Sequence, residues 1–241
     1  MLLGGAAAAG VAWSAPAVLG VDRAAAAPFS CVDQTVAWNS VTGSNPWTVT
    51  GTSGDITVQA RIRAFVSAGA TATTTLNLGN IVQRMSGHAI GDYWNTRLTF
   101  SHASGTICQA SATILDIDQN DIGLGCATVS RFNDEISNLG GAGLSVTTQG
   151  GLIQRSPGVY GSSLLCKTGD TENLAMTWSV ASGVLNGRFR WTARTPPNGS
   201  PTLDLQLIKL TPFVICATVA SPTPAPAAAS ASTFQRGGIG D

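Results

Sequence analysis

The sequence predicts an all-β protein, a single antiparallel β-sandwich with a jelly-roll-like arrangement of strands. Short runs that alternate apolar and polar residues follow one another from Pro28 to about Ala217, and turn-forming Gly, Asn, Ser and Pro separate them at roughly 8–12-residue spacing. No stretch keeps a helical period over three turns. Because most runs have one polar side, antiparallel sheets with one buried face are favoured.

Composition is consistent with one folded domain and excludes some partners. Of the 241 residues, 44% are hydrophobic and 11% are charged, and the formal net charge is zero. A domain at residues 28–218 is long enough to bury a continuous core. Zero net charge gives no general attraction to nucleic acids or anionic membranes, so neither is an expected partner.

The clearest predicted strand is Asp55–Val66, in which six apolar residues alternate with Thr57, Gln59, Arg61 and Arg63. Other predicted strands are Arg97–His102, Asn173–Val180, Arg188–Arg194, Leu203–Leu207 and Thr211–Val219.

Two local details of this assignment depend on short patterns. In Leu203–Leu207 the three leucines are expected to face the core, which turns Gln206 toward solvent. A single helical turn is compatible with Ile90–Thr96 or with Arg131–Leu139.

The two ends of the chain differ from its middle. Residues 1–27 predict an export signal, because an Ala/Gly-rich apolar stretch precedes a run of small residues with cleavage expected near Ala26 or Ala27. A transmembrane anchor is the alternative, disfavoured because alanine and glycine partition poorly into hydrocarbon. Residues 219–241 predict a disordered tail rich in proline and alanine. The expected location is secreted or at the cell surface, without membrane association after signal removal.

The five cysteines would all remain in the exported chain, where disulfides are expected. Cys31 and Cys216 begin and end the predicted core, and we predict that they are bonded because the first and last strands of a sandwich commonly lie side by side. Cys108 and Cys126 are the second predicted pair. Their loop of ~19 residues would contribute on the order of 3 kcal/mol to stability.

A cluster of acidic residues follows an apolar strand that begins at Ala112. The candidate ligands in it are Asp116, Asp118, Asn120, Asp121 and Asp134. Alternation along a strand places the first two side chains on the same face. Oxygen ligands at this density suit calcium, and no lysine lies near them in the sequence to offset their repulsion. The cluster therefore predicts a calcium site, with a solvated turn as the alternative.

Three segments resemble uncharacterised bacterial surface β-sandwich modules. The shared pattern is a Thr-Phe-Ser strand, a strand that ends in Asp-x-Asp, and a later aromatic-x-Asp-x-apolar segment. The matching segments are Leu98–Ser101, Ala112–Asp118 and Arg131–Ile136. Over roughly residues 95–216 the resemblance implies an extracellular, adhesive or wall-associated context, with Asp116, Asp118 and Asp134 at matching positions. The cysteine-bearing insertion around Cys126 departs from the pattern.

Fewer residues support a catalytic function than a binding function. Paired carboxylates serve glycosidases, and Asp116 and Asp118 at about 7 Å along a strand would fit the inverting geometry. A serine hydrolase is disfavoured because the chain lacks Gly-x-Ser-x-Gly, and its two histidines, His88 and His102, are expected at the surface.

Arginine and tryptophan side chains offer two candidate binding surfaces. One predicted strand carries Arg188, Arg190 and Arg194, which could bind an acidic polysaccharide. The alternative is that these arginines form a solvated face that pairs with the acidic cluster on a neighbouring strand. The tryptophans near turn signals, which are candidates for stacking on sugar rings, are Trp38, Trp47 and Trp94. Trp178 and Trp191 alternate with apolar residues and are predicted to be buried.

These features predict an exported, non-catalytic structural or interaction module of adhesion type. The expected partner is an extracellular protein or a cell-wall glycan. A carbohydrate-binding module is the first alternative, and a glycoside-acting enzyme that uses the paired aspartates is the second.

Overall fold

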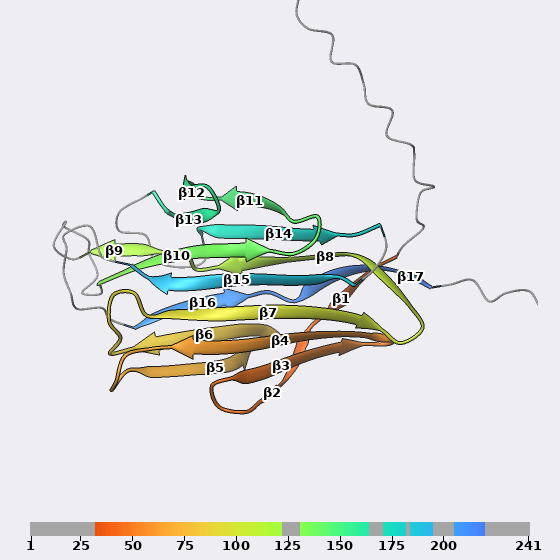
Figure 1. Cartoon of the computed structure of the whole chain (residues 1–241), viewed down its shortest axis with the longest axis horizontal. Helices are drawn as coiled ribbons and strands as arrows, with labels where there is room; N and C mark the ends of the chain where they lie inside the picture. The colour runs from red at the N-terminus through yellow and green to blue at the C-terminus, as the bar shows by residue number, and fades with distance from the viewer. Residues whose placement is uncertain (1–31, 122–130, 164–170, 182–183, 195–204, 220–241) are drawn as a thin grey trace, which may run out of the picture. The chain divides into compact units, whose positions relative to one another are not determined.

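The computed structural model describes residues 32–121, 131–163, 171–181, 184–194 and 205–219. Every regular element in these ranges is a β-strand, and two antiparallel sheets pack against each other (Figure 1). The predicted all-β sandwich is confirmed. Within the described ranges there is also no helix long and apolar enough to cross a membrane.

The two sheets combine hairpins of consecutive strands, such as β2–β3–β4, β5–β6 and β12–β13, with pairs between strands far apart in the sequence. The first sheet contains β1 (Val32–Val36), β5 (Thr71–Asn77), β6 (Asn80–Ser86), β8 (Gly105–Leu115), β11 (Ser145–Gln149), β14 (Asn173–Ser179), β16 (Gln206–Leu210) and β17 (Phe213–Val219). The second sheet contains β2 (Trp38–Thr42), β3 (Trp47–Ser53), β4 (Ile56–Phe65), β7 (Tyr93–His102), β9 (Gln119–Asp121), β10 (Arg131–Gly140), β12 (Leu152–Ser156), β13 (Val159–Ser162) and β15 (Asn186–Ala193). From β4 onward the chain passes repeatedly from one sheet to the other, which is the predicted jelly-roll-like character.

β4 shows how the alternating pattern builds the core. Its five apolar residues from Ile56 to Ala64 are buried, whereas Gln59, Arg61 and Arg63 are exposed. β3 and β7 pair with its two edges, so β4 lies inside the second sheet. Burial of an aliphatic side chain stabilises the fold by about 1.5–3 kcal/mol, which favours one strand register over its one-residue slip.

Aromatic side chains fill the centre of the space between the sheets. Trp47 stacks on Trp94 with ring centroids 5.1 Å apart, and Trp94 lies 6.0 Å from Trp191. Phe213 from the first sheet meets Phe100 of the second edge to face at 5.0 Å. These contacts tie both sheets into one hydrophobic core.

Two local predictions about secondary structure are wrong. Neither predicted helical turn exists, because Tyr93–His102 and Arg131–Gly140 are strands with partners on the second sheet. The face of β16 is also reversed. Gln206 is 2% exposed and its Oε1 lies 2.6 Å from Nε2 of the buried His88, while Leu205 is 53% exposed. This polar pair between β16 and the segment after β6 replaces the apolar contact that the alternation predicted.

The structure contradicts one of the two predicted disulfides. Cys108 is a free thiol. It is the extra residue of a β-bulge, since Gln109 pairs with Cys216 and Ile107 with Ala217.

The second predicted bridge remains untested. Cys216 is disulfide-bonded rather than free. Cys31 and Cys126 both lie outside the described residues, so the pairing of Cys216 with Cys31 stays a prediction. The predicted export signal and the tail beyond Val219 also lie outside the described residues, and the domain boundaries stay predictions.

Candidate functional site: an arginine face on the second sheet

Five arginines lie on the outward side of three neighbouring strands. Because β4, β7 and β15 each bury every second residue, the residues between point away from the core. We call this surface the arginine face and define it by Arg61, Arg63, Arg97, Arg188 and Arg190. These five make up more than a third of the 13 lysines and arginines of a chain whose formal net charge is zero.

Strand register aligns three of these arginines in a row. Arg61 of β4 lies opposite Arg97 of β7, and Arg97 lies opposite Arg188 of β15. Adjacent strands are ~4.8 Å apart, so the row runs across the sheet for about 10 Å. We call these three residues the arginine row. Like charges placed directly opposite one another repel and destabilise a sheet.

Among the described residues, no acidic side chain relieves this repulsion. The outward positions of β4, β7 and β15 carry no aspartate or glutamate. None of the five arginines forms an ion pair with a described residue, since the ion pairs present join Arg194 to Glu135 and Lys209 to Asp116. The arginine face is therefore a largely exposed positive surface, and no described acidic residue neutralises it.

Two stacked aromatic rings hold the other two arginines in place. Phe65 and Tyr93 stack with centroids 4.7 Å apart. The Arg63 guanidinium lies 4.8 Å from the Phe65 ring centroid, and that of Arg190 lies 4.2 Å from Tyr93. Arg190 Nε also donates to Asn95 Oδ1 at 3.0 Å. Both rings are already in contact with a partner ring and a cation, which leaves them poorly placed to stack on a sugar or a base.

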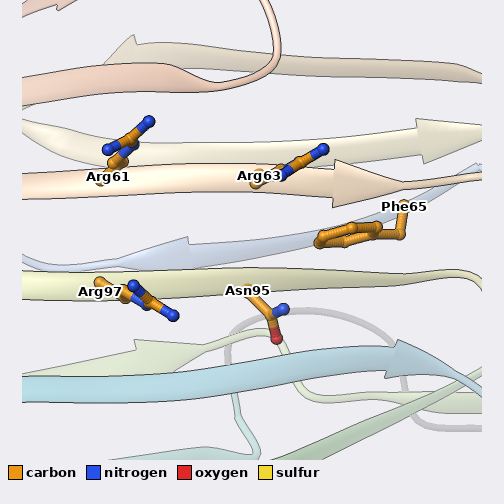
Figure 2. Close-up of a pocket in the computed structure, with 5 residues that line it drawn as sticks. All are labelled: Arg61, Arg63, Phe65, Asn95 and Arg97. Carbon is orange, nitrogen blue, oxygen red and sulfur yellow. The ribbon is translucent and has the colours of Figure 1, made fainter.

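Two shallow hollows meet at Arg97. The first, of about 240 Å³, lies between β4 and β7, and Figure 2 shows its lining residues. They are Arg61, Arg63, Phe65, Asn95 and Arg97. The second hollow, of about 220 Å³, includes Arg97, Arg188, Thr99 and Asn186 in its lining. Arg97 therefore borders both hollows.

Gly140 positions the far end of the arginine row. It pairs with Arg188 in the register of β10 and β15. A Cβ atom at this position would lie 2.8 Å from Arg188 Nε, so the guanidinium rests where a larger side chain would be. The glycine therefore lets Arg188 lie flat against the sheet.

The predicted calcium ligands lie elsewhere, at the end of β8 and the start of β10. β8 ends at Leu115, and Asp116 has a left-handed φ of 68°, so strand alternation stops before the acidic residues. Asp118 is 3% exposed and Ile117 is fully buried. A lysine that the sequence did not place nearby, Lys209, lies with Nζ 3.6 Å from Asp116 Oδ2.

The structure does bring Asp118 and Asp134 together. The Asp134 amide donates to the Asp118 carbonyl at 2.9 Å, and the Asp118 amide donates to Asp134 Oδ2 at 3.2 Å. Trp191 Nε1 donates to Asp134 Oδ1 at 2.7 Å. Burial raises the pKa of Asp134 well above its ordinary value, against the lowering effect of the Trp191 hydrogen bond.

A second polar network lies beside this pair. Arg194 Nε donates to Glu135 Oε2 at 2.7 Å, and Arg155 Nη2 donates to Gln119 Oε1 at 2.8 Å and to the Ser162 carbonyl at 2.7 Å. Burial lowers the pKa of Arg155, and Glu135 opposes this shift. Arg194 therefore forms an ion pair with Glu135, as expected if this arginine belongs to a solvated face that pairs with the acidic residues.

We call Asp116, Asp118, Asp134, Glu135 and Glu172 the acidic end. Among the described residues, no group of three or more His, Cys, Asp or Glu side chains is placed to hold a metal ion. Asn120 and Asp121 pair with β10 through their backbones, but their side chains lie outside the described part of the structure. Calcium binding therefore stays a prediction.

Sequence reasoning found one strand of the arginine face and missed its assembly. Arg188 and Arg190 were recognised as an exposed row, and Arg61 and Arg63 as the polar side of β4. Arg97 was not singled out, and only strand pairing shows that it joins the two sets. The tryptophans proposed for sugar stacking are not available, because Trp38, Trp47 and Trp94 are all buried.

Comparison with protein-family models, with curated proteins and with solved structures finds no match to this chain.

Proposed function

We propose that this protein is an exported, non-catalytic interaction module, secreted or at the cell surface, that holds an anionic partner on the arginine face. The single observation that carries the proposal is the set of five arginines, four exposed and Arg190 half-buried, on three paired strands whose outward positions carry no aspartate or glutamate. Arginine recognises carboxylates, sulfates and phosphates through paired N–H donors, and a partner would relieve the repulsion within the arginine row.

The acidic end supports a structural role better than a catalytic one. A glycosidase needs two carboxyl groups that reach the substrate. Asp118 and Asp134 are 3% and 1% exposed, and Asp116 lies beside Lys209 with 13% of its side chain exposed. Protein groups surround these carboxyls, so a binding function is the stronger proposal.

Glycan binding through charge is a form of this function, whereas glycan binding through tryptophan stacking loses its support. The carbohydrate-binding alternative relied on rings near turns, and Trp38, Trp47 and Trp94 belong to the core. The remaining exposed rings, Phe65 and Tyr93, already carry guanidinium groups.

Retention on a sulfonated cation-exchange resin at pH 7 tests the proposal. A chain with zero formal net charge should pass through unless it carries a concentrated positive surface. We expect retention that is lost in the triple variant Arg61→Gln, Arg97→Gln, Arg188→Gln.

Arg84→Gln is the matched control, because Arg84 is exposed on β6 of the other sheet and its loss changes net charge without touching the arginine face. Free passage of the wild-type chain, or equal loss of retention in a triple variant and in Arg84→Gln, would contradict the proposed function.

A further inference from the structure

We infer that the ligand of the arginine face is a linear acidic polysaccharide that runs across the strands, along the arginine row, from the hollow at Arg61 to the hollow at Arg188. This inference rests on the proposed function and adds to it the ligand class and the direction of binding.

The direction follows from the register. Arg61, Arg97 and Arg188 lie in one line perpendicular to the strands, with the two outer residues about 10 Å apart. The hollows of about 240 and 220 Å³ share Arg97 and extend to opposite sides of the row, the first toward Asn95 and the second toward Thr99. A small anion can engage one or two neighbouring guanidiniums, whereas a polymer with repeated negative charges can engage all three at once.

A second row of neutral polar groups runs beside the first. Gln59 of β4 lies opposite Thr99 of β7, and Thr99 lies opposite Asn186 of β15. All three side chains are exposed. They stand two residues along each strand from the arginine row, roughly 7 Å away by the strand rise. Amide and hydroxyl groups at this position can hydrogen-bond the hydroxyls of a sugar ring whose carboxylate or sulfate meets the arginines.

Single-stranded nucleic acid is the competing polyanion, and the arginine face lacks what it needs. Proteins that bind single strands combine a basic groove with aromatic rings on which bases stack. The rings of this surface, Phe65 and Tyr93, stack on each other and lie under Arg63 and Arg190. Charge recognition with hydroxyl contacts therefore favours an acidic polysaccharide.

The test measures binding of the whole chain to polygalacturonate, heparin, galacturonic acid, neutral dextran and an oligothymidylate by isothermal titration calorimetry at low salt. We expect both acidic polysaccharides to bind more tightly than the oligothymidylate, and galacturonic acid and dextran to bind negligibly. Affinity for oligogalacturonates should rise with chain length until the row is spanned.

Three single variants locate the ligand. Arg97→Gln should weaken polygalacturonate binding about tenfold, the loss expected for one charge-assisted contact. Arg63→Gln, on the same face but outside the row, should weaken it no more than about threefold. Arg84→Gln, on the other sheet, should leave it unchanged, and circular dichroism should show the same β-sheet spectrum for all three.

The outcomes distinguish failure of the polysaccharide assignment from failure of the proposed anion-binding function. Tighter binding of oligothymidylate with the same dependence on Arg97 would overturn the polysaccharide assignment but support an anion-binding arginine face. Equal affinity for galacturonic acid and its polymer, or equal losses in Arg63→Gln and Arg97→Gln, would overturn the direction of binding. Absence of binding to every polyanion would overturn the proposed function itself.

Discussion

The arginine face and the acidic end carry opposite charges, and the protein holds those charges in opposite ways. Four of the five arginines are exposed and Arg190 is half-buried, and none of the five forms an ion pair with a described residue. The acidic side chains are largely buried and are held by Trp191, Arg194, Lys209 and backbone amides. The zero net charge of the chain therefore does not mean that charge is evenly spread, since the arginine face gathers five of its 13 basic residues.

The contrast in burial between the two regions indicates which charged residues contribute to folding. A buried carboxyl is tolerated only when hydrogen bonds compensate its lost hydration, and the acidic end supplies such bonds within the fold. Exposed like charges in one row oppose stability, and solvation alone does not require them. The outward side of β5 is also exposed to solvent, and it carries the neutral residues Thr71, Thr73 and Thr75.

The largest expected effect is the loss of the Asp134 carboxyl. Asp134→Ala removes the acceptors of Trp191 Nε1 and the Asp118 amide, and each buried donor left unpaired costs about 1–3 kcal/mol. We expect the free energy of unfolding to fall by on the order of 3 kcal/mol in urea titrations. Asp33→Ala, at an exposed position on β1, should change it by less than ~0.5 kcal/mol. Retention on the cation-exchange resin should be unchanged in both variants. Weaker retention of Asp134→Ala would contradict the assignment of binding to the arginine face and of structural support to the acidic end.

Calcium tests whether the acidic end is also a ligand site. The predicted ligands are Asp116, Asp118, Asn120, Asp121 and Asp134. A cation that binds only the folded state would stabilise it by about 2.7 kcal/mol at a hundredfold excess over Kd. The sequence-based expectation is a higher melting temperature in calcium up to about 10 mM, abolished by Asp118→Ala. A melting curve that does not move would leave the acidic end with its structural role alone.

The pH dependence of stability reports on the same buried carboxyl. The folded-state pKa of Asp134 is raised, mainly by burial, so the folded protein binds a proton that the unfolded chain releases. The stability that this group contributes is fully present below its unfolded pKa and is lost as the pH rises through the folded pKa. In Asp134→Asn this component of the pH dependence should disappear. An identical pH profile of the urea midpoint in wild type and variant would show that Asp134 ionises normally.

The smallest effect is expected on the arginine face, with the opposite sign. Arg97→Gln removes the central charge of the arginine row and should stabilise the ligand-free protein by about 0.2–1 kcal/mol at low salt. The gain should shrink in 1 M salt, where the Debye length falls to about 3 Å. Destabilisation by Arg97→Gln in urea titrations at low salt would mean that the arginine supports the fold, and would remove the contrast between the two regions.

Local pattern was sufficient for the faces of several strands. In β4 and β15 strict alternation separated buried residues such as Ile62 and Trp191 from the exposed arginines. This inference succeeds because the side-chain period of a strand is two and depends on no other segment. The alternation rule placed the wrong face of β16 inward because Gln206 is buried, where its side chain hydrogen-bonds with that of His88.

Residue patterns alone predicted the β-sandwich and the outward-facing residues of β4 and β15. The three-dimensional structure was needed to place Arg61, Arg97 and Arg188 in one row, because they become neighbours through the pairing of β4, β7 and β15. It also decided that Asp118 is buried against Asp134 and that Cys108 lies in a bulge. The physical reason is that alternation is a property of each strand alone, whereas register and strand order arise from long-range pairing that no local pattern encodes.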